Sequence, residues 1–387
     1  MSKRNRSQEY APYEEEEVVS AKPKKKKKGS GLLGRIIRRF FLVLFTIVIL
    51  AVVALALVMN MIFNGPSPAA RNVLTMSLTE ASATKWVPGL FMDDETVAEI
   101  RANVEETLPD DFTNTDMVVI RDNTLSGSSD EFADYPDGIY IENVYGATYN
   151  AYVMVIQDPT RVYMATSTDG KYSESIPGTR ITDEIETEGA IAAINAGAFN
   201  DNGTADATVG SVPAGLVMVN GEVKSNVLHG MVPEDGFVGF NKDNVLVVAK
   251  SMTAEQAKEQ NIRDGCEFGP VLIMNGVVNQ EAYNSASGYN PRTAIGQRAD
   301  GVVLFVCIDG RQAGSIGGTY KDLIDILSEY GAVNACNMDG GSSSVMLYRD
   351  TYGRYGDAGQ VQMINNYSVL QSKPRRMPNF WMVKPAG

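Results

Sequence analysis

The sequence has few of the residue types from which metal sites and histidine-dependent catalytic sites are built. Its 387 residues include one histidine and three cysteines. It has no His-Glu-x-x-His motif and no Cys/His cluster with the spacing of zinc ligands. A Ser-His-Asp triad would depend on His229, which lies in a polar turn and which we interpret as a surface residue. Acid–base chemistry must therefore fall mainly to carboxylates.

Three cysteines are also too few for a disulfide framework. Cys307 and Cys336 lie within apolar runs, which favours buried thiols, although a bond between these two residues stays open. The domain must then be stabilised by ordinary apolar burial, for which its length is sufficient.

One long run of the sequence lacks charge. From Phe40 to Phe63 there are 24 residues without a charged side chain. At about 1.5 Å per residue, a helix of this length crosses a hydrocarbon core of about 30 Å. A cleaved secretory signal is the alternative, but its apolar region usually spans only about 7–15 residues, and Asn64 to Ala70 offers a weak cleavage pattern. We therefore predict a transmembrane helix at residues 40–63.

The charge on either side of this run predicts its orientation. The first 39 residues contain 12 Lys or Arg and five Glu, so they carry +7, while the whole chain carries −13 and the remainder −20. Because Lys and Arg beside a span stay in the cytoplasm, the acidic part is expected outside the cell. This topology accounts for the basic segment without a nucleic-acid partner.

Composition divides the rest of the chain into three parts. Residues 1–39 are of low complexity and are predicted to be a disordered basic cytoplasmic tail. Residues 64–137 are predicted to form a stalk and a helical juxtamembrane region, to which we assign a supporting role. Residues 138–387 are long enough for one large domain.

Short β-rich runs separated by Gly, Asn and Asp predict the strands of that domain. Two Asn-Gly pairs, at Asn220 and Asn275, are typical of tight antiparallel hairpins. The candidate strands are Ile139–Tyr145, Ala151–Gln157, Arg161–Thr166, Ala190–Asn195, Gly215–Val219, Val245–Ala249, Val271–Met274, Val302–Asp309 and Val333–Met338.

Three helices are predicted from apolar spacing and start signals. One lies between Lys85 and Leu108 and begins at Asp93 or Asp94. The others are Thr253–Asn261 and Thr319–Tyr330. Together these elements predict an α+β fold, with a mixed, largely antiparallel sheet and flanking helices, preceded by one N-terminal transmembrane helix.

Four segments join strands to polar loops, which is where rigid scaffolds usually present functional groups. Two of them carry an Asp directly after an apolar strand. Each segment alone is also compatible with a turn, a cap or a structural ion pair. They are Asn195-Ala-Gly-Ala-Phe199, Asn290-Pro-Arg-Thr293, Asp309-Gly-Arg311 and Asp339-Gly-Gly-Ser342.

Together, these residue types suit a phosphorylated sugar. Paired carboxylates serve glycosidic cleavage, since one protonates the leaving oxygen while the other attacks or activates water. The planar guanidinium of Arg binds phosphate in a bidentate manner. The Gly-Ser loop after Asp339 exposes backbone N–H groups and could bind an anion. The sequence has no G-x-x-x-x-G-K-[ST] loop, so nucleotide hydrolysis of that type is unsupported.

In this order, the four motifs resemble those of the phosphodiester glycosidase family. Its namesake is N-acetylglucosamine-1-phosphodiester alpha-N-acetylglucosaminidase, and bacterial members are often described as exopolysaccharide-related surface proteins. The resemblance covers roughly Tyr149 to Val383, and Arg376-Met-Pro-Asn379 is similar to the family's closing Arg-x-x-Asn pattern. Two departures are small: Ala196 and Ala198 flank Gly197, and Ser342 replaces a third glycine.

The resemblance implies an α+β domain that cleaves a sugar–phosphodiester linkage and leaves a phosphomonoester. We take Asp309 and Asp339 as the acid/base pair, without assigning which is the acid, and Arg292 and Arg311 as phosphate ligands. No cofactor or metal is expected, although a divalent ion beside the two Asp stays open. The residues expected to orient the sugar or the developing charge are Asn195, Gly197, Phe199, Asn290, Thr293, Gly340, Gly341 and Ser343.

The expected function is a cell-surface hydrolase that acts on a phosphodiester-linked sugar of an envelope or exopolysaccharide glycan. Two alternatives stay open. One is a transferase that attaches a phospho-linked glycan to the cell wall, which would need an acceptor other than water. The other is a non-catalytic polysaccharide-binding module, which would need neither Asp.

Overall fold

A computed structural model of the chain describes residues 32–79, 84–102, 108, 111–120, 130–200, 209–227, 236–367 and 373–387. His229 and the segment predicted as a disordered tail up to residue 31 lie outside these ranges. The chain divides into two compact units, residues 1–58 and 59–387.

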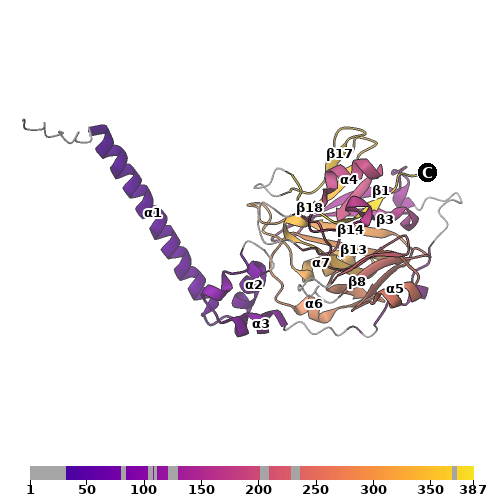
Figure 1. The fold of residues 1–387 in the computed structure, drawn as a ribbon, viewed down its shortest axis with the longest axis horizontal. Coiled ribbons are helices and arrows are strands. Elements are labelled where there is room, and N and C mark those ends of the chain that lie inside the picture. The colour runs from indigo at the N-terminus through magenta and orange to yellow at the C-terminus, as the bar shows by residue number, and fades with distance from the viewer. Residues whose placement is uncertain are drawn as a thin grey trace, which may run out of the picture. The chain divides into compact units, whose positions relative to one another are not determined.

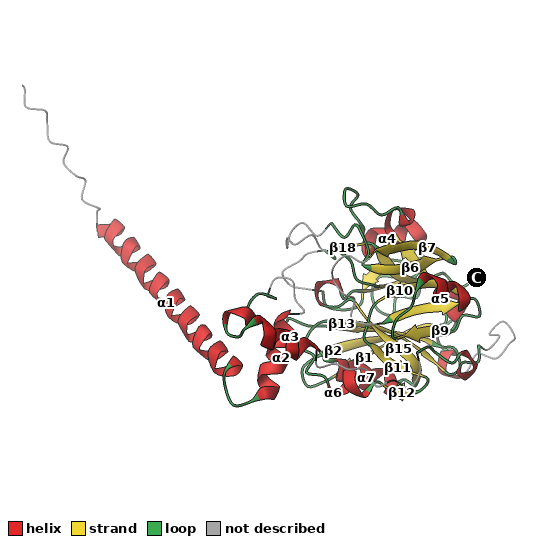
Figure 2. Ribbon diagram, turned by 60° about the horizontal axis from the view of Figure 1, so that its bottom comes forward, coloured by secondary structure: helices red, strands yellow, loops and turns green. Residues whose placement is uncertain are grey.

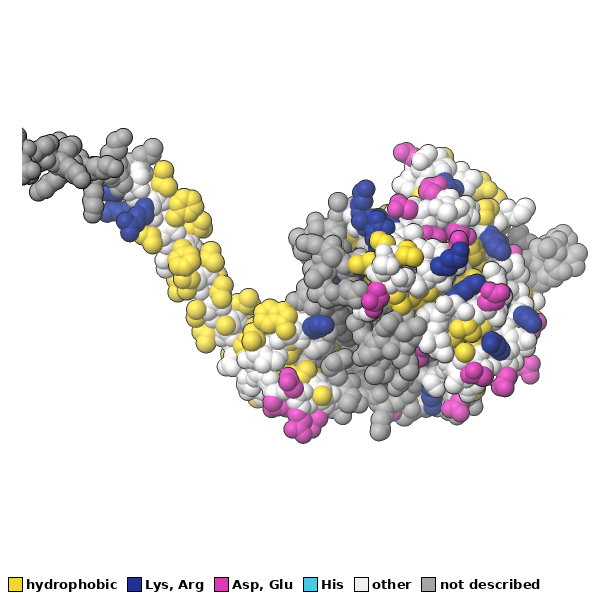
Figure 3. Space-filling model, viewed as in Figure 1, with side chains coloured by type: hydrophobic (Ala, Val, Ile, Leu, Met, Phe, Trp, Pro, Cys, Tyr) yellow, Lys and Arg dark blue, Asp and Glu magenta, His cyan; other side chains and the backbone are white. Residues whose placement is uncertain are grey.

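The apolar run forms one long helix, α1 (Leu32–Phe63), which begins before the predicted span and includes Arg35, Arg38 and Arg39. Figure 3 shows apolar side chains along this helix and Lys and Arg side chains near its first turns. Among the described residues, it is the helix long and apolar enough to cross a membrane. This finding fits a signal anchor or a single-pass membrane protein.

Short helices follow α1. They are α2 (Pro68–Thr79), η1 (Pro88–Leu90) and α3 (Asp94–Ala102). The Asp93 carboxylate accepts a hydrogen bond from the Thr96 N–H at 2.7 Å, so Asp93 caps α3, as the sequence suggested. The short 3₁₀ turns η2 to η5 lie at Thr115–Met117, Asp130–Phe132, Pro159–Arg161 and Ser167–Gly170.

The largest sheet has seven strands in the order β1-β2-β14-β13-β15-β11-β12. Every pairing within it is antiparallel among the residues described. In that order, its strands are Ile139–Tyr145, Asn150–Ile156, Val303–Ile308, Arg292–Arg298, Ala332–Met338, Val271–Met274 and Val277–Val278.

Two further antiparallel sheets have five strands each. One has the order β7-β6-β10-β8-β9, with strands Glu222–Val227, Gly215–Val219, Ile262–Glu267, Phe237–Asn241 and Leu246–Ala249. The other has the order β17-β16-β5-β19-β3, with strands Val361–Met363, Met346–Arg349, Ala192–Asn195, Asn379–Val383 and Val162–Thr166. A two-stranded ribbon pairs β18 (Arg376–Met377) with β4 (Thr179–Arg180).

The three sheets enclose one apolar core, because alternate side chains of each strand point inward. Phe305 of the first sheet, Phe240 of the second and Trp381 of the third belong to this shared cluster. The outward side chains pack under helices: α6 (Gln280–Asn284) and α7 (Tyr320–Glu329), α4 (Ile181–Glu188), and α5 (Ala254–Glu259) (Figures 1 and 2). The α+β, largely antiparallel prediction is therefore confirmed.

Local signals were the most reliable. Both Asn-Gly pairs have positive φ at each residue, as a type I′ hairpin requires. Thr319 and Asp322 form the expected capping box at the start of α7. All three cysteines are buried free thiols, as the sequence favoured for Cys307 and Cys336.

The candidate strands do not include ten of the nineteen strands among the described residues, and the omission that matters most for the site is β13, the central strand of the largest sheet. The sequence pattern instead places Asn290 to Thr293 in a segment that joins a strand to a polar loop. Its pattern is weak because Arg292, Thr293 and Gln297 are polar, yet all three are buried by neighbouring strands and helices.

Helix α2 docks on the loop that precedes β13. The Ser77 hydroxyl accepts a hydrogen bond from the Tyr289 N–H at 3.0 Å. A Cβ atom added at Gly288 would lie 2.2 Å from the Cα, N and Oγ atoms of Ser77, so this approach requires glycine.

We expect Gly288→Ala to separate α2 from this loop, with an overpacking cost of about 1–3 kcal/mol. Hydrogen exchange of the α2 amides should accelerate while that of the central strands stays unchanged. Gly314→Ala is the matched control, because an added Cβ meets no atom within 4 Å there. Equal exchange of α2 in both variants would contradict the docking.

Candidate functional site

The register of β13 gathers the predicted motifs at one edge of the largest sheet. Arg292 pairs with Ile308 of β14 and Thr293 pairs with Met338 of β15. The next residues of these two strands, Asp309 and Asp339, therefore leave the sheet on either side of the first residues of β13. Their backbones are two strand spacings apart, about 10 Å.

The Asp309 carboxyl group is buried, with 1% of the residue exposed. Its Oδ1 accepts a hydrogen bond from the Asn366 N–H at 2.9 Å, and its Oδ2 accepts from the Asn366 side chain at 2.8 Å and the Tyr152 hydroxyl at 3.2 Å. Burial raises the pKa of Asp309 above its ordinary range, and these hydrogen bonds offset part of that effect. The net shift favours the protonated form of the carboxyl group relative to an exposed Asp.

Asn366 belongs to a tripeptide that the sequence analysis did not single out. Next to it, Asn365 accepts the Met346 N–H at 2.8 Å, and the Tyr367 hydroxyl donates to the Ser342 carbonyl at 2.5 Å. This segment therefore connects the Asp309 carboxyl group to the Gly-Ser loop that follows Asp339. The only available signal was a pair of Asn residues and a Tyr after a short apolar run.

The Gly-Ser loop is held against the start of β13. The Gly341 N–H donates to the Pro291 carbonyl at 2.9 Å, and a Cβ at Gly340 would lie 2.8 Å from the same oxygen. Gly341 also has φ +62°, a conformation that favours glycine. These two glycines allow close contact between the loop and the backbone, and η6 (Gly341–Ser343) follows from this turn.

Asn195 fastens three of the four motifs together. Its Oδ1 accepts from the Thr293 hydroxyl at 2.8 Å and from the Val345 N–H at 3.2 Å, while its Nδ2 donates to the Asp339 carbonyl at 2.6 Å. Asn195 and Thr293 are fully buried. From the buried interior, Asn195 therefore positions the backbone of Asp339.

Two arginines lie beside consecutive residues of the Gly-Ser loop. The exposed Arg311 donates to the Asn290 Oδ1 at 3.0 Å, and a Cβ at Gly341 would lie 3.2 Å from its Nη2. Arg375, which the sequence analysis did not select, donates to the Ser342 hydroxyl at 3.2 Å.

The Arg375 guanidinium also lies over the Phe199 ring at 4.8 Å. Phe199 is 6% exposed and belongs to the core cluster under α4. The structure thus places Phe199 beneath Arg375, where its buried ring supports the guanidinium. Ser343 is fully buried near the same guanidinium, at 3.5 Å from its Nη1.

Arg292 points away from Asp309 to the face of the sheet covered by α7. Its guanidinium lies 4.4 Å from the Tyr320 ring centroid and donates to the carbonyl groups of Gly288 at 2.7 Å and Gly318 at 3.2 Å. Alternation along β13 explains this, because Arg292 and Thr293 must lie on opposite faces. Arg292 organises the loops that carry Asn290.

Gly197 serves close packing. A Cβ there would lie 3.1 Å from the Cβ of Cys266, and the Gly197 N–H donates to the Asn379 side chain at 3.0 Å. Asn379 is the last residue of the Arg376–Asn379 motif, so this contact joins two motifs that lie far apart in the sequence.

The structure therefore gathers Asp309, Asp339, the Gly-Ser loop and Arg311 at one edge, adds Arg375, and places Arg292 on the other face. The functional roles of all these residues stay predictions. Among the described residues, no group of three or more His, Cys, Asp or Glu could hold a metal ion.

A family model described as phosphodiester glycosidase matches residues 188–384, about half of the chain. The chain is also 27% identical over 173 residues to the SPbeta prophage-derived uncharacterized protein YomE of Bacillus subtilis (strain 168). That alignment covers 42% of this chain and 25% of YomE, so the chain spans only a quarter of this relative's length.

Solved structures with some similarity include the zebrafish N-acetylglucosamine-1-phosphodiester alpha-N-acetylglucosaminidase catalytic domain auto-inhibited by its pro-peptide. Its TM-score is 0.49 at 16% identity, over 64% of this chain and 82% of that one. A hypothetical protein from Synechocystis has a TM-score of 0.42 at 17% identity, over 64% and 62% of the two chains. A putative exported protein from Burkholderia pseudomallei K96243 has 0.39 at 16%, over 61% and 74%.

The raised pKa of Asp309 makes stability depend on pH in a defined direction. Since the folded-state pKa lies above the ordinary value of about 3.9, deprotonation disfavours the folded state. Relative to Asp309→Asn, the wild type should keep a constant free energy of unfolding below about pH 3.9 and lose stability as pH rises through the folded-state pKa. Denaturant unfolding of both proteins across this range measures the difference.

Tyr152→Phe provides the matched comparison, because it keeps the carboxyl group but removes a hydrogen bond that favours its ionised form. The loss of stability should then be larger and extend to higher pH. A wild type that gains stability over Asp309→Asn as pH rises would show that the pKa is lowered.

Proposed function

Because this chain belongs to the phosphodiester glycosidase family, which supports a glycosidase-type hydrolase function, we propose that it is a cell-surface hydrolase. Its substrate is a sugar-1-phosphodiester linkage in an envelope or exopolysaccharide glycan. The observation that carries the proposal is the buried carboxyl group of Asp309, whose pKa is raised at the same sheet edge as Asp339.

Asp309 is the general acid in this proposal. A carboxyl group that holds its proton nearer to neutral pH can give it to the oxygen that leaves the sugar. Asn366 and Tyr152 fix the orientation of the carboxyl group and can stabilise the carboxylate after the transfer. Burial by the surrounding strands excludes water from the carboxyl group, and this keeps its pKa raised.

Asp339 is the second carboxylate and either activates water or attacks the sugar. It is half-buried, so it is accessible to a ligand, and its backbone is fixed on both sides. The Asp339 N–H donates to the Ala196 carbonyl at 3.1 Å, and the Asp339 carbonyl accepts from Asn195. Such anchoring keeps a reacting group in place.

Arg311 and Arg375 bind the phosphate that becomes the leaving group. They lie beside Gly341 and Ser342, so a phosphate over the Gly-Ser loop would lie between two positive charges. Their attraction strengthens as negative charge builds on the leaving oxygen, which lowers the barrier. Asn290 orients Arg311, while Arg292 and Thr293 hold the loops in place.

The chain is anchored by α1 as a single-pass membrane protein, with the N-terminus in the cytoplasm and the domain outside. The excess of Lys and Arg before α1 supports this orientation.

The proposal is tested by incubating the purified protein with a panel of sugar-1-phosphodiesters and quantifying free sugar and phosphomonoester. Asp309→Asn and Asp339→Asn should each lower turnover by about 10²–10⁴-fold, because each removes a proton-transfer or nucleophilic group. Asp243→Asn, on an exposed turn, is the matched control and should retain activity.

Folded Asp309→Asn and Asp339→Asn variants with full activity would exclude the acid/base assignment. Product that appears only with a glycan acceptor would favour a transferase, and glycan binding without turnover would favour a binding module.

Arg375→Lys tests the phosphate site separately. Lysine keeps the charge but loses the planar guanidinium that lies over Phe199 and reaches Ser342. We expect kcat/KM for phosphodiester substrates to fall by about 10²-fold. An unchanged value would remove Arg375 from the proposed site.

A further inference from the structure

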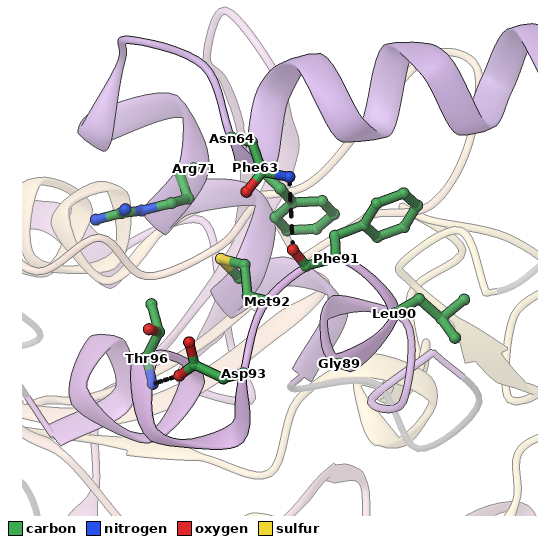
Figure 4. Close-up of a pocket in the computed structure, with 9 residues that line it drawn as sticks. All are labelled: Phe63, Asn64, Arg71, Gly89, Leu90, Phe91, Met92, Asp93 and Thr96. Atoms are coloured by element: carbon green, nitrogen blue, oxygen red, sulfur yellow. Dashed lines mark hydrogen bonds between the residues drawn. The ribbon is translucent and has the colours of Figure 1, made fainter.

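The end of α1 is fixed to the segment around η1. The Phe63 side chain is almost completely buried, at 1% exposed, and its ring stacks on Phe91 with centroids 5.2 Å apart and planes at 20°. The Asn64 side chain donates to the Phe91 carbonyl at 3.5 Å, as Figure 4 shows. Because Phe63 is the last residue of α1, η1 is held at the level where the apolar helix ends.

Two large apolar side chains beside this contact are exposed. Trp86 is 62% exposed and Leu90 is 66% exposed, although the intervening Pro88 is buried. Such residues would be costly in water at about 25 cal/mol per Å² of apolar surface. Tryptophan, however, is enriched at the boundary between membrane and water, where its ring is partly apolar and its N–H can hydrogen-bond.

Polar side chains near η1 lie on the side of a pocket opposite Leu90. The pocket, of about 340 Å³, is lined by the end of α1, by Arg71 of α2 and by the segment that leads into α3. Figure 4 shows Leu90 and Phe91 on one side of it, and Arg71 and Thr96 on the opposite side. Helix α3 adds the acidic residues Asp94 and Glu95 in its first turn. The segment is thus amphipathic beside a span, as expected at a bilayer surface.

We propose that Trp86 and Leu90 insert into the interfacial layer of the same bilayer that α1 crosses. The occupant of this exposed apolar surface is a phospholipid membrane, because the surface continues the apolar helix through the Phe63–Phe91 contact. The inference goes beyond the catalytic proposal and rests only on the membrane anchoring by α1.

This arrangement also sets the position of the candidate site. Helix α2 begins five residues after Phe63 and contacts Tyr289, which precedes Asn290. Four extended residues and the helical rise to Ser77 span at most about 30 Å. The Asn290 edge of the site is therefore held within that distance of the membrane boundary.

The chain carries two tryptophans, so fluorescence can test the proposal on the full-length protein. Trp381 is fully buried in the shared core, edge-to-face with Phe240. The protein is reconstituted into phosphatidylcholine vesicles that carry bromine on the acyl chains near the headgroup. We expect the Trp86 share of the emission to be quenched and blue-shifted, and to resist aqueous iodide.

The Trp86→Phe variant gives the fluorescence emission of Trp381 alone. Brominated lipid should leave this emission unchanged. Tyr352→Trp in the Trp86→Phe background is the matched control, because Tyr352 is 46% exposed in the loop before β17. In Figure 1, β17 lies at the top of the domain and α2 at its lower left. This tryptophan should respond to iodide and not to brominated lipid.

Flotation of the vesicles separates the two proposals. Protein that floats with the vesicles but whose Trp86 responds only to iodide would overturn the interfacial inference and leave the anchor standing. Protein that does not float would overturn the anchor and this inference with it, without affecting the catalytic proposal.

Discussion

The antiparallel pairing of β13 with both β14 and β15 is the constraint on which the candidate site depends. Because of this pairing, β14 and β15 both end beside the first residues of β13. Asp309 and Asp339, which follow these two strands, therefore lie at one edge of the sheet, although 29 residues separate the last residue of β14 from the last residue of β15. Burial of the shared core between three sheets makes this register costly to change, since a slip of one residue would turn apolar side chains outward. The geometry of the site thus follows from the core.

Hydrogen bonds between buried polar side chains then hold the groups at this edge in fixed positions. The Asn195 amide binds groups from β13, the Asp339 loop and the start of β16, while Asn365 to Tyr367 join Asp309 to the Gly-Ser loop. Buried polar groups are costly unless paired, so each link holds its partners in one arrangement. Burial acts on the chemistry as well, because it raises the pKa of Asp309. One physical effect therefore stabilises the fold and favours the protonated carboxyl group.

Local patterns in the sequence were sufficient for the fold class, nine of the nineteen strands among the described residues, the Asn-Gly hairpins and the cap of α7. They could not show how strands far apart in the chain pair, so β13 was missed and Arg292 was expected beside the two Asp. The motifs were recognised as a set. The sequence could not show the roles of Asn195 and Asn379, because both side chains bind backbone groups that are distant in the chain. Arg375 carried no local signal, and only its contacts with Ser342 and Phe199 bring it to the site.

The central claim is that the protein breaks the bond between sugar carbon and oxygen, and not the bond between phosphorus and oxygen. Hydrolysis of a sugar-1-phosphodiester in water enriched in oxygen-18, followed by phosphorus NMR and mass spectrometry of both products, distinguishes the two. The account predicts oxygen-18 at carbon 1 of the released sugar and none in the phosphomonoester. Oxygen-18 bound to phosphorus would show a phosphodiesterase, and would contradict the roles proposed for Asp309 and Asp339.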